Sequence, residues 1–88
     1  MRFLQYDFYA GPEDVIEVTL DRQANVRLLD DCSYWAYREG RSHRYYGGRA
    51  TVSPVRLCPP HHGHWNVVVD LGEYGGQVRA ALRVLGQG

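Results

Sequence analysis

Short runs in which apolar and polar residues alternate recur along this chain, and they constrain its fold more than any other feature. Near the N-terminus, Leu4, Tyr6 and Phe8 alternate with Gln5 and Asp7. A period of two is typical of a strand that buries one face. Similar runs occupy residues 16–20, 24–28, 55–57, 65–71 and 78–85, with Gly and Pro turn signals between several of them. The pattern predicts an all-β fold, a single small antiparallel β-sandwich or partly open barrel over residues 1–88.

Two neighbouring runs near the C-terminus are expected to form a β-hairpin. The stretch between them, residues 72–76, is rich in glycine, which suits a tight turn. The second run, residues 78–85, also fits helical spacing, because Ala and Leu favour helix. We predict a strand there, since the alternation is unbroken and a turn precedes it.

Residues 31–40 differ from the strand pattern and predict a short helix of one turn or two. Asp31 could serve as its N-cap, and Tyr34 and Tyr37 would share one face. Gly40 would end it. The stretch from 40 to 51 then has no core periodicity, and a long loop in a compact domain is often functional.

The formal net charge is zero, but the charges are unevenly distributed. Residues 7–31 hold seven acids and two arginines, whereas residues 38–49 hold four arginines and one acid. Such a dipolar surface can steer a charged partner or a second copy of the chain. No signal peptide pattern precedes Asp7, and no apolar run approaches the ~20 residues that span a bilayer. A cytoplasmic protein is expected, with Cys32 and Cys58 as free thiols.

The arginine-rich stretch is the first candidate site. Arginine presents a fork of donors to phosphate or carboxylate, tyrosine offers a stacking face, and paired glycines allow close backbone approach. The alternative is a solvated turn whose tyrosines fold back onto the sandwich under the arginines. An anionic small molecule or a protein is the expected partner, with self-association possible and no nucleic acid expected. The candidate ligand-binding residues are Arg41, His43, Arg44, Tyr45, Tyr46, Gly47, Gly48, Arg49 and His64.

The histidines of residues 61–64 are the second candidate, because imidazole binds transition metals. Their spacing matches no zinc motif, so we expect His61 and His64 to be turn histidines, and we expect no metal or cofactor. Trp65 shares its alternation phase with Val67 and should anchor the core. Asp70 faces the other way and should be a structural partner of an arginine such as Arg79 or Arg56.

Catalytic motifs are absent from the sequence: it has no Gly-x-Ser-x-Gly elbow, P-loop, dinucleotide fingerprint or His-Glu-x-x-His helix. In so small a domain this favours a recognition module over an enzyme. A structural or oligomerisation domain is the alternative. An enzyme with His43 or His64 as general base is the third hypothesis.

Several motifs occur in order along the chain and carry a resemblance. They are Asn25-Val26-Arg27-Leu28, His43-Arg44-Tyr45-Tyr46-Gly47-Gly48, Ser53-Pro54-Val55-Arg56-Leu57 and Gly63-His64-Trp65. With them the chain resembles a family of small bacterial domains of unknown function, found alone or N-terminal to TIR signalling domains. The resemblance implies a β-rich domain in a bacterial cytoplasm with a sensing or adaptor role. It implies no catalytic residues.

Overall fold

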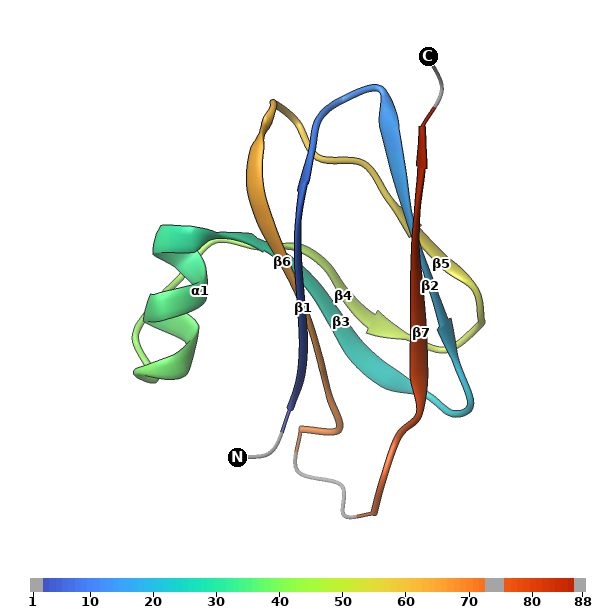
Figure 1. The fold of residues 1–88 in the computed structure, drawn as a ribbon. Coiled ribbons are helices and arrows are strands. Elements are labelled where there is room, and N and C mark those ends of the chain that lie inside the picture. Colours follow the sequence, from blue (N-terminus) through green and yellow to red (C-terminus); the bar gives the residue numbers. More distant parts are fainter. Residues whose placement is uncertain (1–2, 73–75, 87–88) are drawn as a thin grey trace.

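The alternating runs fold into strands, and the structure is a β-sandwich (Figure 1). It is a computed structural model that describes residues 3–72 and 76–86. Residues 73–75 of the predicted turn lie outside the described residues. The elements are β1 (Leu4–Ala10), β2 (Asp14–Leu20), β3 (Ala24–Asp30), α1 (Asp31–Arg38), β4 (Tyr46–Ala50), β5 (Val55–Leu57), β6 (Gly63–Asp70) and β7 (Ala80–Gly86).

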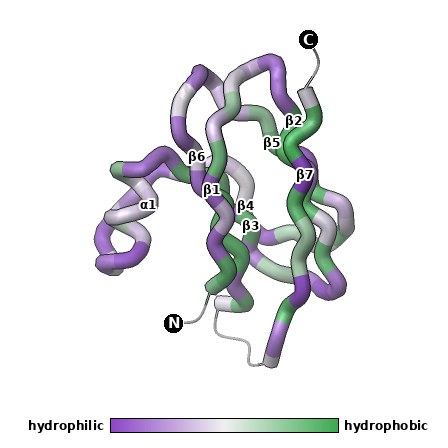
Figure 2. Tube along the Cα trace, viewed as in Figure 1, coloured by the Kyte–Doolittle hydropathy of each residue, from purple (hydrophilic) through white to green (hydrophobic). Residues whose placement is uncertain are grey.

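Two antiparallel sheets make up the sandwich. The larger has the strand order β1-β6-β3-β4 and the smaller the order β5-β2-β7. The sheets do not join into a closed barrel, so the sandwich form of the prediction is confirmed. In Figure 2, hydrophobic residues recur along β2, β3 and β7, whereas the turn after α1 is hydrophilic. No helix in the described ranges is long and apolar enough to cross a membrane.

The core lies between the two sheets and is formed by the apolar residues of the alternating runs. Apolar burial of this kind is the main stabilising term of a small domain. Trp65 is its largest fully buried side chain, as predicted. The buried members of the core are Ala10, Ile16, Val18, Leu20, Ala24, Val26, Leu28, Trp65, Val67 and Val69.

Strand β6 is buried on both faces, unlike the half-buried strands around it. Its outward-facing Val68 lies under α1, in a second small cluster with Leu29 and Tyr37. Phe3 and Tyr34 pack against this cluster. The helix therefore covers the middle of the outer face of the larger sheet.

The predicted hairpin between the last two runs is wrong. Strand β6 pairs with β1 and β3, whereas β7 pairs with β2 in the other sheet. Both edges of β6 are already paired, with β1 and with β3, so β7 has no place beside it. Strand β7 has one apolar face and suits the edge of the smaller sheet. The prediction of a strand rather than a helix at residues 78–85 is confirmed by β7.

The loop predicted from residue 40 to 51 is shorter than expected, because residues 46–50 form β4. They pair with β3 in antiparallel register. Gly47 and Gly48 have positive φ, +102° and +145°, which glycine adopts readily. Because glycine has no side chain, this strand lacks a regular apolar alternation. That irregularity hid it from the sequence pattern.

The predicted helix is present and spans eight residues, about two turns. Its N-cap is Asp30, whose Oδ1 accepts a hydrogen bond from the Ser33 N–H at 2.7 Å. Asp31, the predicted cap, instead contacts His64. Gly40, with φ +73°, follows the last turn and ends the helix as predicted.

Candidate functional site

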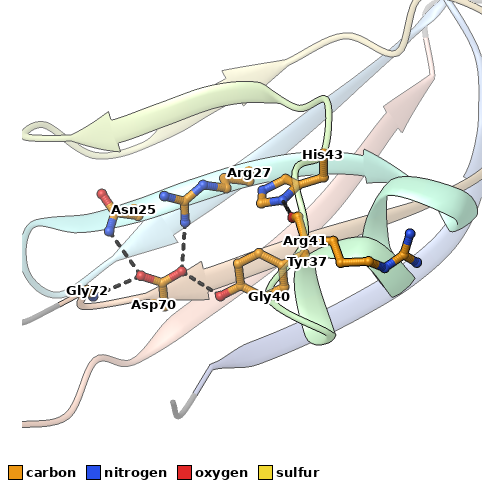
Figure 3. A pocket seen from close by; sticks show the side chains of 8 residues that line it. All are labelled: Asn25, Arg27, Tyr37, Gly40, Arg41, His43, Asp70 and Gly72. Carbon is orange, nitrogen blue, oxygen red and sulfur yellow. Dashed lines mark hydrogen bonds and ion pairs between the residues drawn. The ribbon is translucent and has the colours of Figure 1, made fainter.

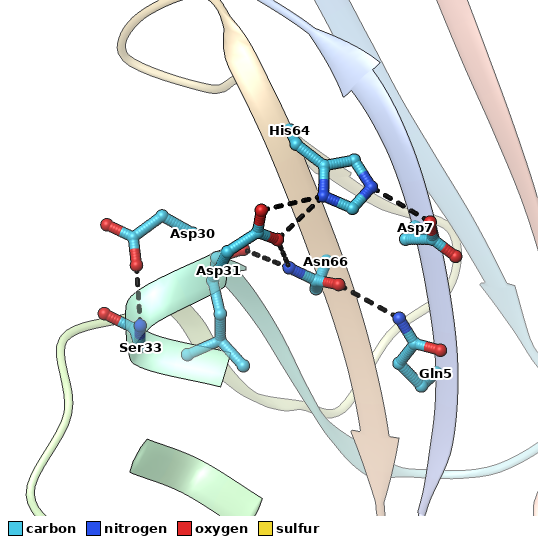
Figure 4. Close-up of polar contacts among 8 residues, drawn as sticks. Gln5, Asp7, Asp30, Asp31, Ser33, His64 and Asn66 are labelled. Carbon is cyan, nitrogen blue, oxygen red and sulfur yellow. Dashed lines mark hydrogen bonds and ion pairs between the residues drawn. The ribbon is translucent and has the colours of Figure 1, made fainter. Parts of the chain in front are cut away.

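Two polar clusters lie on the outer face of the larger sheet, on either side of the area that α1 covers. One surrounds Asp70 at the end of β6, and we call the hollow beside it the Asp70 pocket (Figure 3). The other surrounds His64 near the start of β6, and we call it the His64 clamp (Figure 4). The residues that line the Asp70 pocket are Asn25, Arg27, Tyr37, Gly40, Arg41, His43, Asp70 and Gly72.

The Asp70 carboxylate is 2% exposed and accepts four hydrogen bonds. Its Oδ1 accepts from Asn25 Nδ2 at 2.9 Å and from the Gly72 N–H at 2.8 Å. Its Oδ2 accepts from Arg27 Nη1 and from Tyr37 Oη, both at 2.7 Å. A carboxylate offers about four acceptor sites, so this one has none left for a ligand. Its role is to hold its neighbours in place.

The pKa values of this cluster keep Asp70 charged and Tyr37 neutral. Burial alone would raise the pKa of Asp70, but hydrogen bonds from Asn25, Tyr37 and the Gly72 N–H and the charge of Arg27 outweigh it and lower the pKa. Burial, followed by the hydrogen bond to Asp70, raises the pKa of Tyr37. Both shifts move the pKa values of these groups away from neutral pH. Neither group is thus suited to general acid–base chemistry.

Arg27 is fixed in orientation but keeps a free donor. Its guanidinium carbon lies 5.8 Å from the centre of the Tyr37 ring and 5.1 Å from that of Tyr45. Its Nε is buried without a hydrogen-bond partner among the described residues. Nη1 is bonded to Asp70, whereas Nη2 has no partner in the described part of the chain and is not buried. Nη2 can therefore donate to a ligand.

The turn after α1 forms the rest of the pocket wall, and the pocket volume is about 270 Å³. His43 Nδ1 lies 2.9 Å from the Arg41 carbonyl oxygen, which can only accept, so Nδ1 carries a proton. The His43 ring also meets Tyr37 edge-on at 5.4 Å. The exposed Arg41 guanidinium pairs with Glu39 at 3.1 Å. These contacts fold the turn back against β3.

The structure brings three of the predicted site residues to this pocket. Arg41 and His43 line it, and Tyr45 covers the Arg27 guanidinium from outside. Arg44 is exposed. Tyrosines folded back onto the sandwich were the expected alternative to a ligand loop, and Tyr45 does this while remaining 46% exposed.

The other predicted site residues lie elsewhere. Tyr46 faces the core side and meets Trp65 edge-on. Gly47 is required by backbone packing, because a Cβ there would lie 2.4 Å from the Val26 carbonyl oxygen. Arg49 donates to Gln23. The predicted motif therefore combines pocket residues with residues that build β4.

Sequence reasoning missed Asn25, Arg27 and Tyr37, and it assigned the wrong arginine to Asp70. The partner of Asp70 is Arg27, and Arg56 instead pairs with Glu17 on the smaller sheet. The register of β3 against β6 places Asn25 opposite Asp70, which no local pattern reveals. The available signal was chemical: polar side chains stand at outward positions of two otherwise apolar strands.

The His64 clamp joins three elements through one ring. His64 Nε2 lies 2.9 Å from Asp7 Oδ2 on β1, and Nδ1 lies 2.7 Å from Asp31 Oδ1 at the start of α1. Ionised carboxylates only accept, so the protonated ring can donate from both nitrogens, one to each carboxylate. Asn66 extends the network by donating to Asp31 and accepting from Gln5 (Figure 4). His64 thus lies on a strand rather than in a turn, whereas His61 contacts loop backbone as predicted.

The clamp makes stability depend on pH. Hydrogen bonding to Asp7 and then to Asp31 raises the pKa of His64, so its stabilisation is complete below the unfolded pKa of about 6.5 and is lost as pH rises through the folded pKa. The groups that face the ring are Asp7, Asp31 and the Tyr9 ring. We expect the melting temperature of the wild type to fall, relative to that of His64→Gln, as the pH rises from about 5.5 to 8.5. Circular dichroism measures both melting temperatures.

The exposed His62 provides the control for this measurement. His62→Gln should keep the pH profile of the wild type, because His62 has no carboxylate contact among the described residues. Parallel profiles for wild type and His64→Gln would contradict the role of the clamp.

Metal-ligating residues do not converge in the described ranges. No group of three or more His, Cys, Asp or Glu side chains there has an arrangement that could hold a metal ion. Cys32 and Cys58 are free and exposed.

Comparison with known proteins assigns a family but no activity. No curated protein and no solved structure matches the chain. Residues 1–87 match the model of a family described as a domain of unknown function, DUF1883. This agrees with the resemblance to a family of small domains without assigned function. The chain belongs to the DUF1883 family.

Proposed function

We propose that this domain is a recognition module and that the Asp70 pocket binds a small oxyanion through Arg27. The observation that carries the proposal is the state of the Arg27 guanidinium. Nη1 is bonded to Asp70, two tyrosine rings flank the plane, and Nη2 is left open. A donor that is already oriented loses little entropy on binding, which favours affinity.

The polarity of the pocket supports an anionic ligand. The oxygens of Asp70 are fully occupied by internal donors, so they do not attract a cation. The open donor is Nη2 of Arg27, and Arg41, whose guanidinium pairs with Glu39, adds a positive charge near the pocket. A pocket of about 270 Å³ fits a phosphate or carboxylate group of a small molecule or of a protein side chain.

A recognition role is favoured over catalysis by the same cluster. Asp70 and Tyr37 are the best-placed polar groups, and their pKa shifts keep them in fixed protonation states near neutral pH. Fixed states suit a constant binding surface rather than proton transfer. Binding without turnover also agrees with the sensing or adaptor role that the family resemblance implies.

Binding can be tested by titrating the ¹⁵N-labelled protein with sodium phosphate and, separately, with sodium acetate. We expect saturable shifts of the Arg27 Nε–H resonance, which is observable because that group is buried, and of the Arg41 and His43 amides. Arg41→Ala should weaken binding about two- to fivefold, because it removes an exposed positive charge beside the pocket.

The control for the titration is Arg79→Ala, which removes an exposed arginine that does not line the pocket. Arg79→Ala should bind both anions like the wild type. Shifts that grow linearly with anion concentration, or that are equal in the two variants, would contradict the proposal.

A structural role as a self-associating domain is the second candidate function. It is favoured by one specific observation, the open edge of β7 in the smaller sheet. The two roles do not conflict, because β7 contributes no residue to the Asp70 pocket.

A further inference from the structure

The sandwich has four edge strands, and three of them carry features that discourage pairing with another chain. Strand β5 has three residues and precedes Pro59 and Pro60. Strand β4 is distorted by positive φ at Gly47 and Gly48. Strand β1 carries an exposed charge at its centre, Asp7. Short length, irregular backbone and charge are the usual protections of sheet edges.

Strand β7 is neither short nor irregular. It has seven residues, contains no proline, and has no glycine before Gly86 at its end. Its central Arg83 is exposed and pairs with Glu17 on the outer face of the smaller sheet, as Asp7 of β1 pairs with His64. In the sheet order β5-β2-β7, its only strand neighbour among the described elements is β2. In Figure 1, β7 stands at the margin of its sheet.

The hydrogen bonds next to β7 reveal which of its backbone groups face outward. The Asp21 N–H donates to the Arg79 carbonyl, so residue 79 faces β2, and by alternation residues 81, 83 and 85 do the same. Residues 80, 82, 84 and 86 therefore face away from β2. The Ala80 carbonyl agrees with this assignment, because it accepts a hydrogen bond from Tyr6 Oη at 3.1 Å on the outer side.

We propose that β7 pairs with β7 of a second copy of this chain, antiparallel across a two-fold axis at Val84. An antiparallel pair of β7 strands related by a two-fold axis is isologous, which means that both copies use the same surface. Val84 is 39% exposed although it stands on the side of β7 that faces the other sheet. Pairing would join the two smaller sheets into one continuous sheet and cover both Val84 side chains.

A register centred on Val84 uses the free groups without a conflict. A pairing centred on Leu82 requires the Ala80 carbonyl, which Tyr6 already occupies. A pairing centred on Arg83 places Arg83 directly opposite its copy, and like charges directly opposite destabilise a strand pair. A pairing centred on Val84 sets Leu82 opposite Gly86 and Arg83 opposite Leu85. Its three outward pairs would exchange about six hydrogen bonds.

Sedimentation equilibrium over a range of protein concentrations tests the pairing. We expect a concentration-dependent dimer for the wild type. Val84→Pro removes an N–H that points away from β2 and leaves the hydrogen bonds to β2 in place. It should therefore raise the dimer dissociation constant at least about tenfold. Val84→Thr keeps the N–H and the β-branched shape and should dimerise like the wild type.

Val84→Lys keeps the test decisive if the proline variant does not fold. It places two ammonium groups next to the axis, and it should be a folded monomer at concentrations where the wild type is a dimer. A wild type that stays monomeric at every concentration, or a Val84→Lys variant that dimerises normally, would overturn the proposal.

Disulfide trapping tests the register. Cys32 and Cys58 are first replaced by serine, since both are free and exposed. Opposite residues of a hydrogen-bonded pair have Cα atoms about 5.5 Å apart, which a disulfide can bridge. Val84→Cys should then form a crosslinked dimer on mild oxidation, and Leu82→Cys should not. The reverse result would overturn the register centred on Val84.

Discussion

Replacing Asp70 with alanine is expected to lower the free energy of unfolding by about 3 kcal/mol. Removing one member of a buried ion pair costs about 3–5 kcal/mol, because the remaining charge loses its partner. The lower end applies here, since the Arg27 side chain is 21% exposed and water can solvate it in part. Tyr37 and Asn25 would also lose their acceptor. Urea denaturation at neutral pH measures the change.

A double-mutant cycle with Arg27→Met separates the ion pair from the other bonds of Asp70. In the Arg27→Met background, Asp70→Ala should cost clearly less than in the wild type, because no guanidinium is left unpaired. Equal costs in the two backgrounds would show that the ion pair contributes nothing. Because the pKa of Asp70 is lowered, its stabilisation is present above the unfolded pKa of about 3.9 and is lost as pH falls through the folded pKa.

Replacing Trp65 with alanine is expected to have the largest effect in the core, about 3–5 kcal/mol. Its side chain is 2% exposed. The ring meets Tyr46 and His61, and its Nε1 donates to the His61 carbonyl at 3.1 Å. Truncation therefore leaves a cavity and an unpaired carbonyl. For a domain this small, such a loss is a large share of the total stability.

Trp65→Phe is the matched variant, because it keeps an aromatic ring in the core. It removes the indole N–H and part of the volume, so its cost should be smaller, about 1–2 kcal/mol. Thermal and urea unfolding of both variants gives the comparison. If the two substitutions cost the same, the hydrogen bond to His61 rather than packing would dominate, contrary to the interpretation of Trp65 as the core anchor.

Except for β4, the strands could be predicted from the sequence because alternation is a local property. Each run was visible without knowledge of its neighbours, and so was the helix that follows Asp30 and ends before Gly40. Strand pairing is not local. The runs of β6 and β7 are consecutive in the chain, but they belong to different sheets, because β1 and β3 occupy both edges of β6.

The candidate site, too, could be predicted from the sequence only in its local part. The turn that contains Arg41 and His43 stood out by its composition, and both residues line the pocket. The contact that orients the pocket joins Arg27 to Asp70, which are 43 residues apart. Only the register between β3 and β6 brings them together, and a single sequence holds no record of that register.

The four hydrogen bonds of Asp70 have a consequence for folding. They come from β3, from α1 and from Gly72 just after β6, so the full network exists only when the β3–β6 pairing and the helix docking are both complete. A partly folded chain with the helix undocked would lose the Tyr37 hydroxyl from Asp70 and the Tyr37 ring from Arg27. The domain would therefore gain its oriented donor and its native tertiary structure in one cooperative step, and intermediates would not compete for the ligand.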